Sequence, residues 1–180
     1  MSERRMGRAA CLVAMAAALC ACGGQKVRDT VPVDALVVPA FAPWISVEPT
    51  QGDLQVRGLD EKVVLTPSRP VSEVLQAQLR KALQPAYISN LTLACERVKT
   101  DMRVRHEDDK PSIATLDISM RCTTNARGFV TRSEPHLEPS AEVNAQTDYS
   151  KLFVSLLGNA SNELATKLQA DIDASKSNLK

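Results

Sequence analysis

Cysteine and histidine have the most distinctive chemistry in this chain of 180 residues, which contains five cysteines and two histidines. A cysteine can carry a thioether-linked lipid, form a disulfide, ligate a metal or act as a nucleophile, depending on its surroundings. Cys11, Cys20 and Cys22 lie close together near the amino terminus, whereas Cys95 and Cys122 lie far along the chain. We therefore expect the two groups to have different roles.

The amino-terminal cysteines belong to a leader with the parts of a secretory signal. Three arginines precede thirteen mostly apolar residues (9–21), a run too short to span a bilayer as a helix. The leader ends in Leu19-Cys20-Ala21-Cys22, which resembles a bacterial lipobox. We interpret residues 1–21 as a lipoprotein signal peptide and Cys22 as the lipidated first residue of the mature chain. The alternative is an ordinary cleaved signal peptide in which Cys22 is incidental.

Lipidation at Cys22 would place the protein at a membrane. The two or three acyl chains of a bacterial lipoprotein bury enough methylene groups, at about 0.8 kcal/mol each, to hold it there permanently. Gly23, rather than an aspartate, follows Cys22, so by resemblance to lipoprotein sorting signals the expected location is the outer membrane. We expect the domain to face the periplasm, although no residue distinguishes the two faces of that membrane.

The composition of the mature chain limits its partners. Removing the leader leaves 159 residues, an ordinary size for one domain, with 19 basic and 20 acidic residues and hence a net charge of −1. This balance, without a basic run, argues against a nucleic-acid partner and against electrostatic lipid binding. We expect a flexible tether over residues 22–33, a single domain over 34–175 and a frayed tail over 176–180.

The remaining cysteines, Cys95 and Cys122, are an even pair in an oxidising compartment, which favours a disulfide. Apolar residues alternate cleanly along 114–122, whereas the alternation along 91–104 slips by one residue at Glu96-Arg97. Such a slip is what a β-bulge produces, and it would place both of these residues opposite Arg121. Folding 90–125 into one hairpin then predicts the pairs Val104 with Ala114, Met102 with Leu116, Thr100 with Ile118, Val98 with Met120, and Cys95 with Cys122.

Two helices are expected to pack on this hairpin. Residues 69–84 and 149–173 each carry an apolar stripe at helical spacing, with Ser68 placed to cap the first helix and Asp148 the second. The predicted fold class is α+β: an antiparallel or mixed sheet with a central bulged hairpin, covered by the two helices. Shorter strand patterns occur at 36–38, 45–47, 54–56 and 63–65, and the turn at 49–52 indicates a hairpin between the second and third of these.

Phe41 and Trp44 are large side chains in a chain with only six aromatic residues. They form a candidate docking surface, either for a partner protein or for the membrane interface near the anchor. The alternative, favoured by the usual burial of large aromatic side chains, is that both cover the core.

The order of these features resembles the YajG-type bacterial lipoprotein family. The resemblance rests on the lipobox, the passage Val64-Leu65-Thr66-Pro67-Ser68-Arg69 followed by Leu75-Gln76, the central hairpin and the long C-terminal helix, and it covers most of residues 30–175. It implies an envelope lipoprotein with a mixed α+β domain and no established catalytic role. No functional residue is carried over from the family, and the disulfide is not assigned from its pattern.

Catalytic and metal-binding constellations are weak in this sequence. His106 precedes three acidic residues, 107–109, which lack the glycine turn and closing glutamate of a calcium loop, so we interpret them as a solvated turn. His136 is the other histidine, and there is no Gly-rich phosphate loop, Gly-x-Ser-x-Gly elbow or His-Glu-x-x-His pair. The sequence therefore predicts a protein that is not an enzyme and has neither cofactor nor metal.

Two non-catalytic functions fit these observations. In the first, the domain is an adaptor or accessory of an envelope protein assembly and docks through a sheet edge or through Phe41 and Trp44. In the second, the space between the helices and the sheet holds an amphiphile, and the protein is an accessory of lipid or glycolipid binding or transport. A core without an apolar cavity would argue against the second function.

Overall fold

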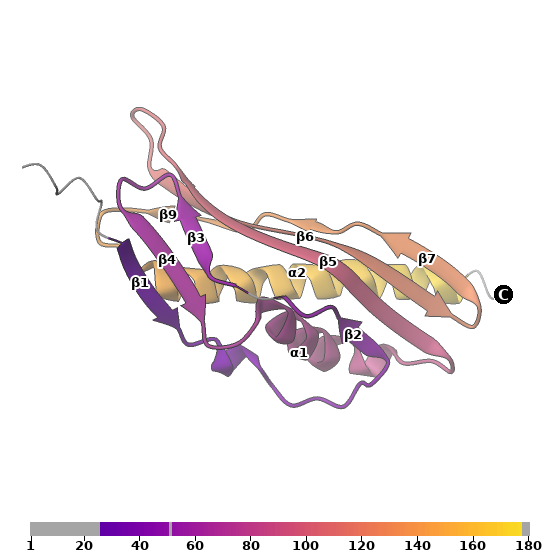
Figure 1. The fold of residues 1–180 in the computed structure, drawn as a ribbon. Coiled ribbons are helices and arrows are strands. Elements are labelled where there is room, and N and C mark those ends of the chain that lie inside the picture. Colours follow the sequence, from indigo (N-terminus) through magenta and orange to yellow (C-terminus); the bar gives the residue numbers. More distant parts are fainter. Residues whose placement is uncertain (1–25, 51, 178–180) are drawn as a thin grey trace, which may run out of the picture.

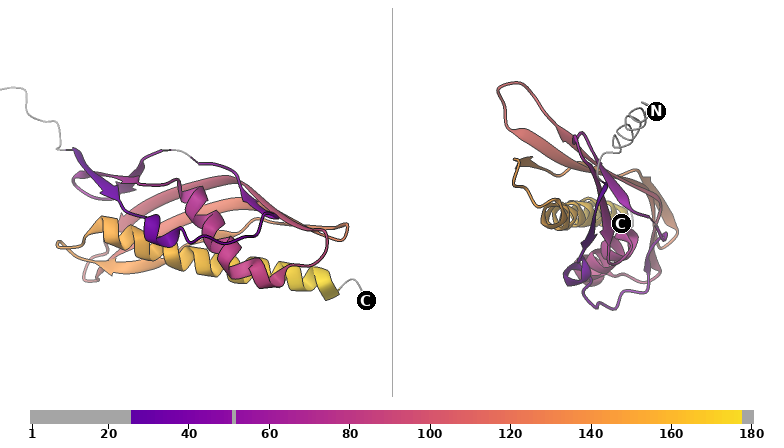
Figure 2. Two further views of the ribbon diagram at one scale, coloured as in Figure 1. Left: turned by 90° about the horizontal axis from the view of Figure 1, so that it is seen from below. Right: turned by 60° about the vertical axis from the view of Figure 1, so that its left-hand side comes forward.

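A computed structural model, which describes residues 26–50 and 52–177, has a nine-stranded mixed sheet with two helices packed on one face (Figure 1 and Figure 2). The predicted α+β class is thus confirmed, whereas the signal peptide and Cys22 lie outside the described residues. The strand order is β1-β4-β3-β5-β6-β7, with β2 also on β5, and with β8 and β9 also on β6. The strands are β1 (Lys26–Val31), β2 (Ile45–Val47), β3 (Leu54–Arg57), β4 (Lys62–Pro67), β5 (Leu91–Arg105), β6 (Ser112–Ala126), β7 (Phe129–Ser133), β8 (His136–Leu137) and β9 (Ser140–Val143). The helices are α1 (Val71–Leu83) and α2 (Tyr149–Ser177), with short 3-10 turns η1 (Asp34–Leu36) and η2 (Gln84–Ala86).

The β5–β6 hairpin is the longest strand pair, and its register follows the sequence pattern. The structure contains the predicted pairs of Val104 with Ala114, Met102 with Leu116, Thr100 with Ile118, and Cys95 with Cys122. The bulge is also present, but it lies one residue later along β5 than the sequence pattern predicts. Glu96 pairs with Arg121 and Lys99 with Ser119, so Arg97 and Val98 together oppose one residue, Met120.

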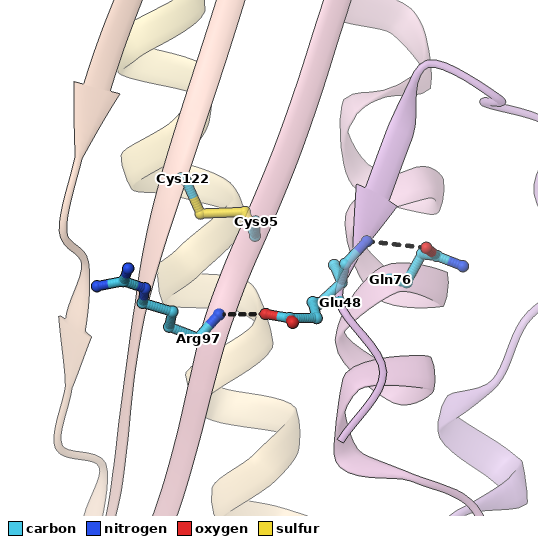
Figure 3. The surroundings of a disulfide bond; sticks show 6 residues. Glu48, Gln76, Cys95, Arg97 and Cys122 are labelled. Atoms are coloured by element: carbon cyan, nitrogen blue, oxygen red, sulfur yellow. Dashed lines mark hydrogen bonds between the residues drawn. A yellow bond between two sulfur atoms is a disulfide. The ribbon is translucent and has the colours of Figure 1, made fainter. Parts of the chain in front are cut away.

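Arg97 is the residue that the bulge removes from the strand ladder, and its φ of 56° lies in the left-handed region. Its amide donates instead to Glu48 Oε2 at 2.7 Å (Figure 3). The amide of Glu48 in turn donates to the carbonyl of Cys95 at 2.8 Å. Beside this contact, Cys95 and Cys122 form the predicted disulfide, and both are buried in the core. The backbone donor of the bulge is therefore satisfied by Glu48, the residue that follows β2, and the disulfide joins β5 and β6 next to it.

The core lies between the sheet and the two helices. Seven residues of the predicted stripe of α2 are at most 1% exposed, and five predicted positions of α1 are also buried. Each large side chain among these contributes roughly 1.5–3 kcal/mol when it leaves water. Ala82, three residues after Leu79 and so at the helical spacing of the α1 stripe, is exposed. The buried positions are Phe153, Leu156, Leu157, Ala160, Leu164, Leu168 and Ile172 of α2, and Val71, Val74, Leu75, Leu79 and Leu83 of α1.

Asp148 caps α2 as predicted. Its Oδ1 accepts from the amides of Ser150 and Lys151, both at 3.1 Å, which satisfies two free donors of the first turn. The hydrogen bond from the Lys151 amide is the main reason that the pKa of Asp148 is lowered. The helix continues to Ser177, so the predicted frayed tail over 176–180 is wrong for its first two residues.

Ser68 does not cap α1, contrary to the prediction. Its hydroxyl donates to Asp34 Oδ2 at 2.7 Å, and Arg69 Nε donates to Asp34 Oδ1 at 2.9 Å. Both hydrogen bonds lower the pKa of Asp34, and the bond from Arg69 has the larger effect. The first turn of α1 is capped across the fold, because the amide of Ser72 donates to Thr50 Oγ1 at 3.2 Å and the amide of Thr50 donates to Ser72 Oγ at 2.9 Å.

The segment predicted as a tether over residues 22–33 is largely part of the fold. Residues 26–31 form β1, an edge strand parallel to β4, and Val31 and Val33 are fully buried. Its polar composition is explained by the edge position, where Arg28 reaches Asp53 at 3.1 Å. Residues 22–25 lie outside the described residues.

Two further strand predictions differ from the structure. Residues 36–38 do not form a strand, because η1 ends at Leu36 and an irregular segment follows. The predicted hairpin over 45–57 is also wrong: β2 pairs with β5 in parallel, and β3 pairs with β4 and β5. Both strands therefore have distant partners along the chain. Within the described residues, we find no helix of the length and apolarity that crossing a membrane requires.

Candidate docking surface

Phe41 and Trp44 lie in the segment that leads into β2, and α1 holds this strand in place. The side chains of Gln76 and Arg80 hydrogen-bond its backbone, and Gln76 Oε1 accepts from the amide of Val47 at 2.9 Å (Figure 3). Polar groups on the outer edge of β2 are thus partly satisfied by α1. The segment before it is consequently attached to a rigid element.

The two predicted residues have different environments. Trp44 is half-buried and packs against the core, with its ring centroid 6.0 Å from that of Tyr87, and its carbonyl accepts from the amide of Leu93 at 2.8 Å. Phe41 is 82% exposed. The interpretation that both residues cover the core therefore holds for Trp44 and is wrong for Phe41.

Three further large apolar side chains are exposed near these residues along the sheet. Tyr87 is 55% exposed, Phe129 47% and Val130 56%. The sequence analysis did not single them out, although Tyr87 follows the helix-ending Pro85 and the other two follow a turn. We define the far-end surface as Phe41, Trp44, Tyr87, Phe129 and Val130.

These residues share the end of the sheet at which β5 begins, on the right in Figure 1. Tyr87 directly precedes Ile88, whose carbonyl accepts from the first residue of β5. Strand pairing places Trp44, Phe129 and Val130, and Phe41 is three residues before Trp44 in the same segment. The pairs that place them are Ile45 with Leu93, Ala126 with Leu91, and Phe129 with Ala126.

The first described residues lie toward the opposite end of the sheet. Val27 pairs with Val63, Val63 with Val56, and Val56 with Met102, so Val27 is level with Met102 of β5. Met102 and Leu91 are eleven residues apart on this strand. At about 3.3 Å per residue, the level of Val27 and the level of Phe129 are separated by about 35 Å.

The far end is free of acidic residues in the three segments that form its surface. Residues 39–44, 84–90 and 125–133 contain no Asp or Glu but include Arg127 and Arg132. Both arginines are exposed, and neither takes part in an ion pair within the described part of the chain. The tip of the β5–β6 hairpin, at the other end, instead carries three exposed acidic residues at 107–109. The two ends of the sheet therefore differ in charge.

A second cluster of polar side chains lies on the outer face of the sheet, where β8 meets β6. His136 Nδ1 is 3.7 Å from Asp117 Oδ1, and His136 Nε2 is 3.4 Å from Glu138 Oε1. Their geometry is compatible with a cation, but Arg103 Nη2 lies 3.2 Å from Glu138 Oε1 and 4.0 Å from Asp117 Oδ2. This guanidinium already supplies positive charge between the carboxylates, so the cluster is best explained as an ion-pair network that ties β8 to β5. His106, the other histidine, bonds Ser112 Oγ and the carbonyl of Gly58 at the hairpin tip.

Two open depressions occur on the described surface. One of about 360 Å³ lies beside the start of α1, with Asp53, Arg69 and Thr100 in its wall. The other, about 350 Å³, lies beside the start of α2 and includes Pro32 and Lys151. The first depression is lined by residues of β3, β4 and β5 as well as by the start of α1, so it opens where this helix meets the sheet. Between α2 and the sheet, buried side chains of the core are packed together.

Comparison with known proteins supports the fold. No family model and no curated protein matches the sequence. A Xanthomonas campestris protein assigned to the family model DUF330 has a similar structure, with a TM-score of 0.51, 13% identity, and coverage of 83% of this chain and 99% of that one.

Two other solved structures are less similar. A minor lipoprotein from Acinetobacter baumannii has a TM-score of 0.42 and 15% identity over 77% of this chain and 96% of that one. An uncharacterized protein has a TM-score of 0.45 and 14% identity over 82% and 99%. These matches do not confirm the YajG-type resemblance. The Xanthomonas match shows that this chain shares its α+β fold with a solved bacterial protein along nearly the whole length of that protein.

Proposed function

We propose that this protein is a lipid-anchored envelope adaptor that docks a protein assembly through the far-end surface and catalyses no reaction. The observation that carries the proposal is the group of exposed aromatic side chains at the end of the sheet opposite the first described residues, with Phe41 82% exposed. Exposed apolar patches mark interaction sites, and this surface has two parts, one beside β2 and one at the β6–β7 turn, on either side of β5 and β6. Aromatic residues and arginine are also the residues most enriched at protein interfaces.

The predicted anchor supports docking away from the membrane that holds it. Cys22 precedes Val27 by five residues, which span at most about 18 Å when fully extended. The level of Val27 is about 35 Å from the level of Phe129 along β5. With Cys22 in the outer membrane and β5 upright, the far-end surface therefore projects into the periplasm, where an envelope protein can reach it.

Photo-crosslinking in intact cells tests this proposal. A benzoylphenylalanine replaces Phe41, Tyr87 or Phe129 in turn, and Glu107 at the opposite end serves as the control position. All four side chains are exposed, so the substitutions remove no core packing. We expect one dominant protein adduct from the three far-end positions and a much weaker one from Glu107. Equal yields at all four positions, or no protein adduct from the far end, would contradict the proposal.

The alternative is an accessory of lipid or glycolipid transport. It requires an amphiphile between the helices and the sheet, and there Phe153 and Ile118 are fully buried among core side chains. We therefore expect native mass spectrometry of the purified Cys22→Ser protein to give the mass of the chain alone. A retained lipid at one molecule per chain would favour the carrier over the adaptor.

A further inference from the structure

We infer that the partner at the far-end surface offers an apolar cleft bordered by carboxylates, and that the β6–β7 turn inserts into this cleft. The inference rests on the proposed function and names the chemistry of the partner. Three properties of the turn carry it: its fixed geometry, the opposite directions of its two apolar side chains, and its unpaired cationic groups.

The β6–β7 turn has a fixed conformation. Ala126 pairs with Phe129, which leaves Arg127 and Gly128 as the two residues of the turn, with φ of 52° and 90°. Positive φ at both central positions gives the turn a twist that matches its two strands. The amide of Gly128 also donates to Asn125 Oδ1 at 3.1 Å. A turn held in this way loses little conformational entropy when it binds a partner.

The apolar side chains beside the turn face both sides of the sheet. Phe129 pairs with buried Ala126, and Val130 pairs with half-buried Asn125. Because successive side chains of a strand point to opposite faces, Phe129 lies on the helix side and Val130 on the outer side. β7 ends the main strand order, so both side chains are reachable around its edge. A flat surface would cover one of them, whereas a cleft covers both.

The positive charge of the turn indicates that carboxylates border the cleft of the partner. Arg127 is exposed at the tip and Arg132 is exposed on β7, and neither has an ion-pair partner within the described residues. The ion pair nearest along the strand, between Arg121 and Glu134 at 2.9 Å, already satisfies the first acidic residue after the turn. Carboxylates on the partner would pair with the two free guanidinium groups. Charges at the border of an interface mainly accelerate association and exclude wrong partners.

An anionic bilayer is the other occupant with this chemistry, and the observations favour a protein. Two cationic residues contribute only about 1 kcal/mol each at an anionic membrane surface. The segment from Cys22 to Val27 spans at most about 18 Å. This is also shorter than the distance of about 35 Å between the level of Val27 and the level of Phe129 along β5. With β5 upright on the membrane that the anchor occupies, the turn lies away from it.

Charge reversal in the full-length lipoprotein, read out by crosslinking in cells, tests the inference. The crosslinker stays at Phe41 while the turn carries Arg127→Glu and Arg132→Glu, and the matched control is Arg105→Glu, an exposed arginine at the opposite end. We expect the reversed pair to lower the yield of the partner adduct at least fivefold, and the control to leave it unchanged. The conservative pair Arg127→Lys and Arg132→Lys should keep most of the yield, because the charge remains.

The outcomes separate this inference from the proposed function. An unchanged adduct in the reversed pair would overturn the inference and leave the adaptor intact, because a partner would still bind. An absence of any protein adduct in the parent would overturn the adaptor itself. A crosslinker at Val130 gives a further readout: a partner peptide with Asp or Glu beside the crosslinked residue supports the cleft, and a phospholipid adduct overturns it.

Discussion

Reduction of the disulfide between Cys95 and Cys122 should destabilise the protein by about 3.5 kcal/mol. The two cysteines are separated by 27 residues. In the chain-entropy account, releasing a loop of this length returns about 12 cal/mol/K of conformational entropy to the unfolded chain, which is about 3.5 kcal/mol at room temperature. Domains of this size are typically stable by about 5–15 kcal/mol, so the disulfide supplies a substantial share.

Urea unfolding of the oxidised and reduced protein measures this quantity. Trp44 is the single tryptophan and is half-buried beside Tyr87, so its fluorescence reports unfolding near β2, while circular dichroism reports the whole chain. For a slope of roughly 1–3 kcal/mol per molar urea, reduction should lower the midpoint by about 1.2–3.5 M. Reduction keeps both sulfur atoms in the core, whereas Cys95→Ala with Cys122→Ala also removes buried volume and should be less stable still. Identical midpoints before and after reduction would refute the reasoning.

Substitutions at Gly58, Phe153 and Asp148, two of them with a matched control, test the fold further. Gly58 has a φ of 82°, and a Cβ there would lie 2.1 Å from the carbonyl oxygen of Val104, so Gly58→Ala should cost about 3 kcal/mol in chemical denaturation. Gly52→Ala, at a φ of 127° in open space, should cost only about 1 kcal/mol, and equal losses would contradict the close approach. Phe153→Ala removes a fully buried ring and should cost about 3–5 kcal/mol, and a loss below 1 kcal/mol would show that the core is not packed as described. Asp148→Ala should lower the thermal midpoint at neutral pH, whereas Asp148→Asn retains a capping oxygen. Because the folded pKa of Asp148 is lowered, its contribution is present above the ordinary aspartate pKa and is lost as the pH falls through the folded value. A difference between parent and Asp148→Ala that is unchanged in strong acid would argue against the charged cap.

The features that could be predicted from sequence are those set by neighbours along the chain. The stripe of α2 and its cap at Asp148 each depend on residues within a few positions. The β5–β6 hairpin depends on a longer pattern, but a single register satisfies both the apolar alternation and the cysteine pair. The bulge lies one residue later than predicted, and there Glu48, from a distant segment, accepts a hydrogen bond from the amide of Arg97.

The features that could not be predicted depend on distant partners. An alternating pattern shows that residues 45–47 form a strand, but it does not distinguish a hairpin with β3 from a parallel pair with β5. β1 has few apolar residues because it is an edge strand, and its polar composition therefore suggested a tether. Ser68 has the residue type of a cap, but Asp34 binds its hydroxyl and Thr50 takes the capping position.

Only part of the candidate site could be predicted, because the rest also depends on distant partners. Phe41 and Trp44 could be found as rare aromatic residues in an irregular segment, yet their exposure depends on which elements cover them. Tyr87 contacts Trp44 from η2, and Phe129 reaches the same end of the sheet through two strand pairs. Neither relation is visible in the sequence, because both require the pairing of distant segments.

Paired photo-crosslinking of the lipidated protein in intact cells tests the central claim most directly. One crosslinker at Asp60, in the connection between β3 and β4 near the level of Val27, is compared with one at Phe129 at the far end. Our account predicts that the adduct from Phe129 is a protein and that phospholipid adducts are confined to Asp60. Phospholipid as the main adduct of Phe129 would contradict the claim that the aromatic end meets a protein away from the anchoring membrane.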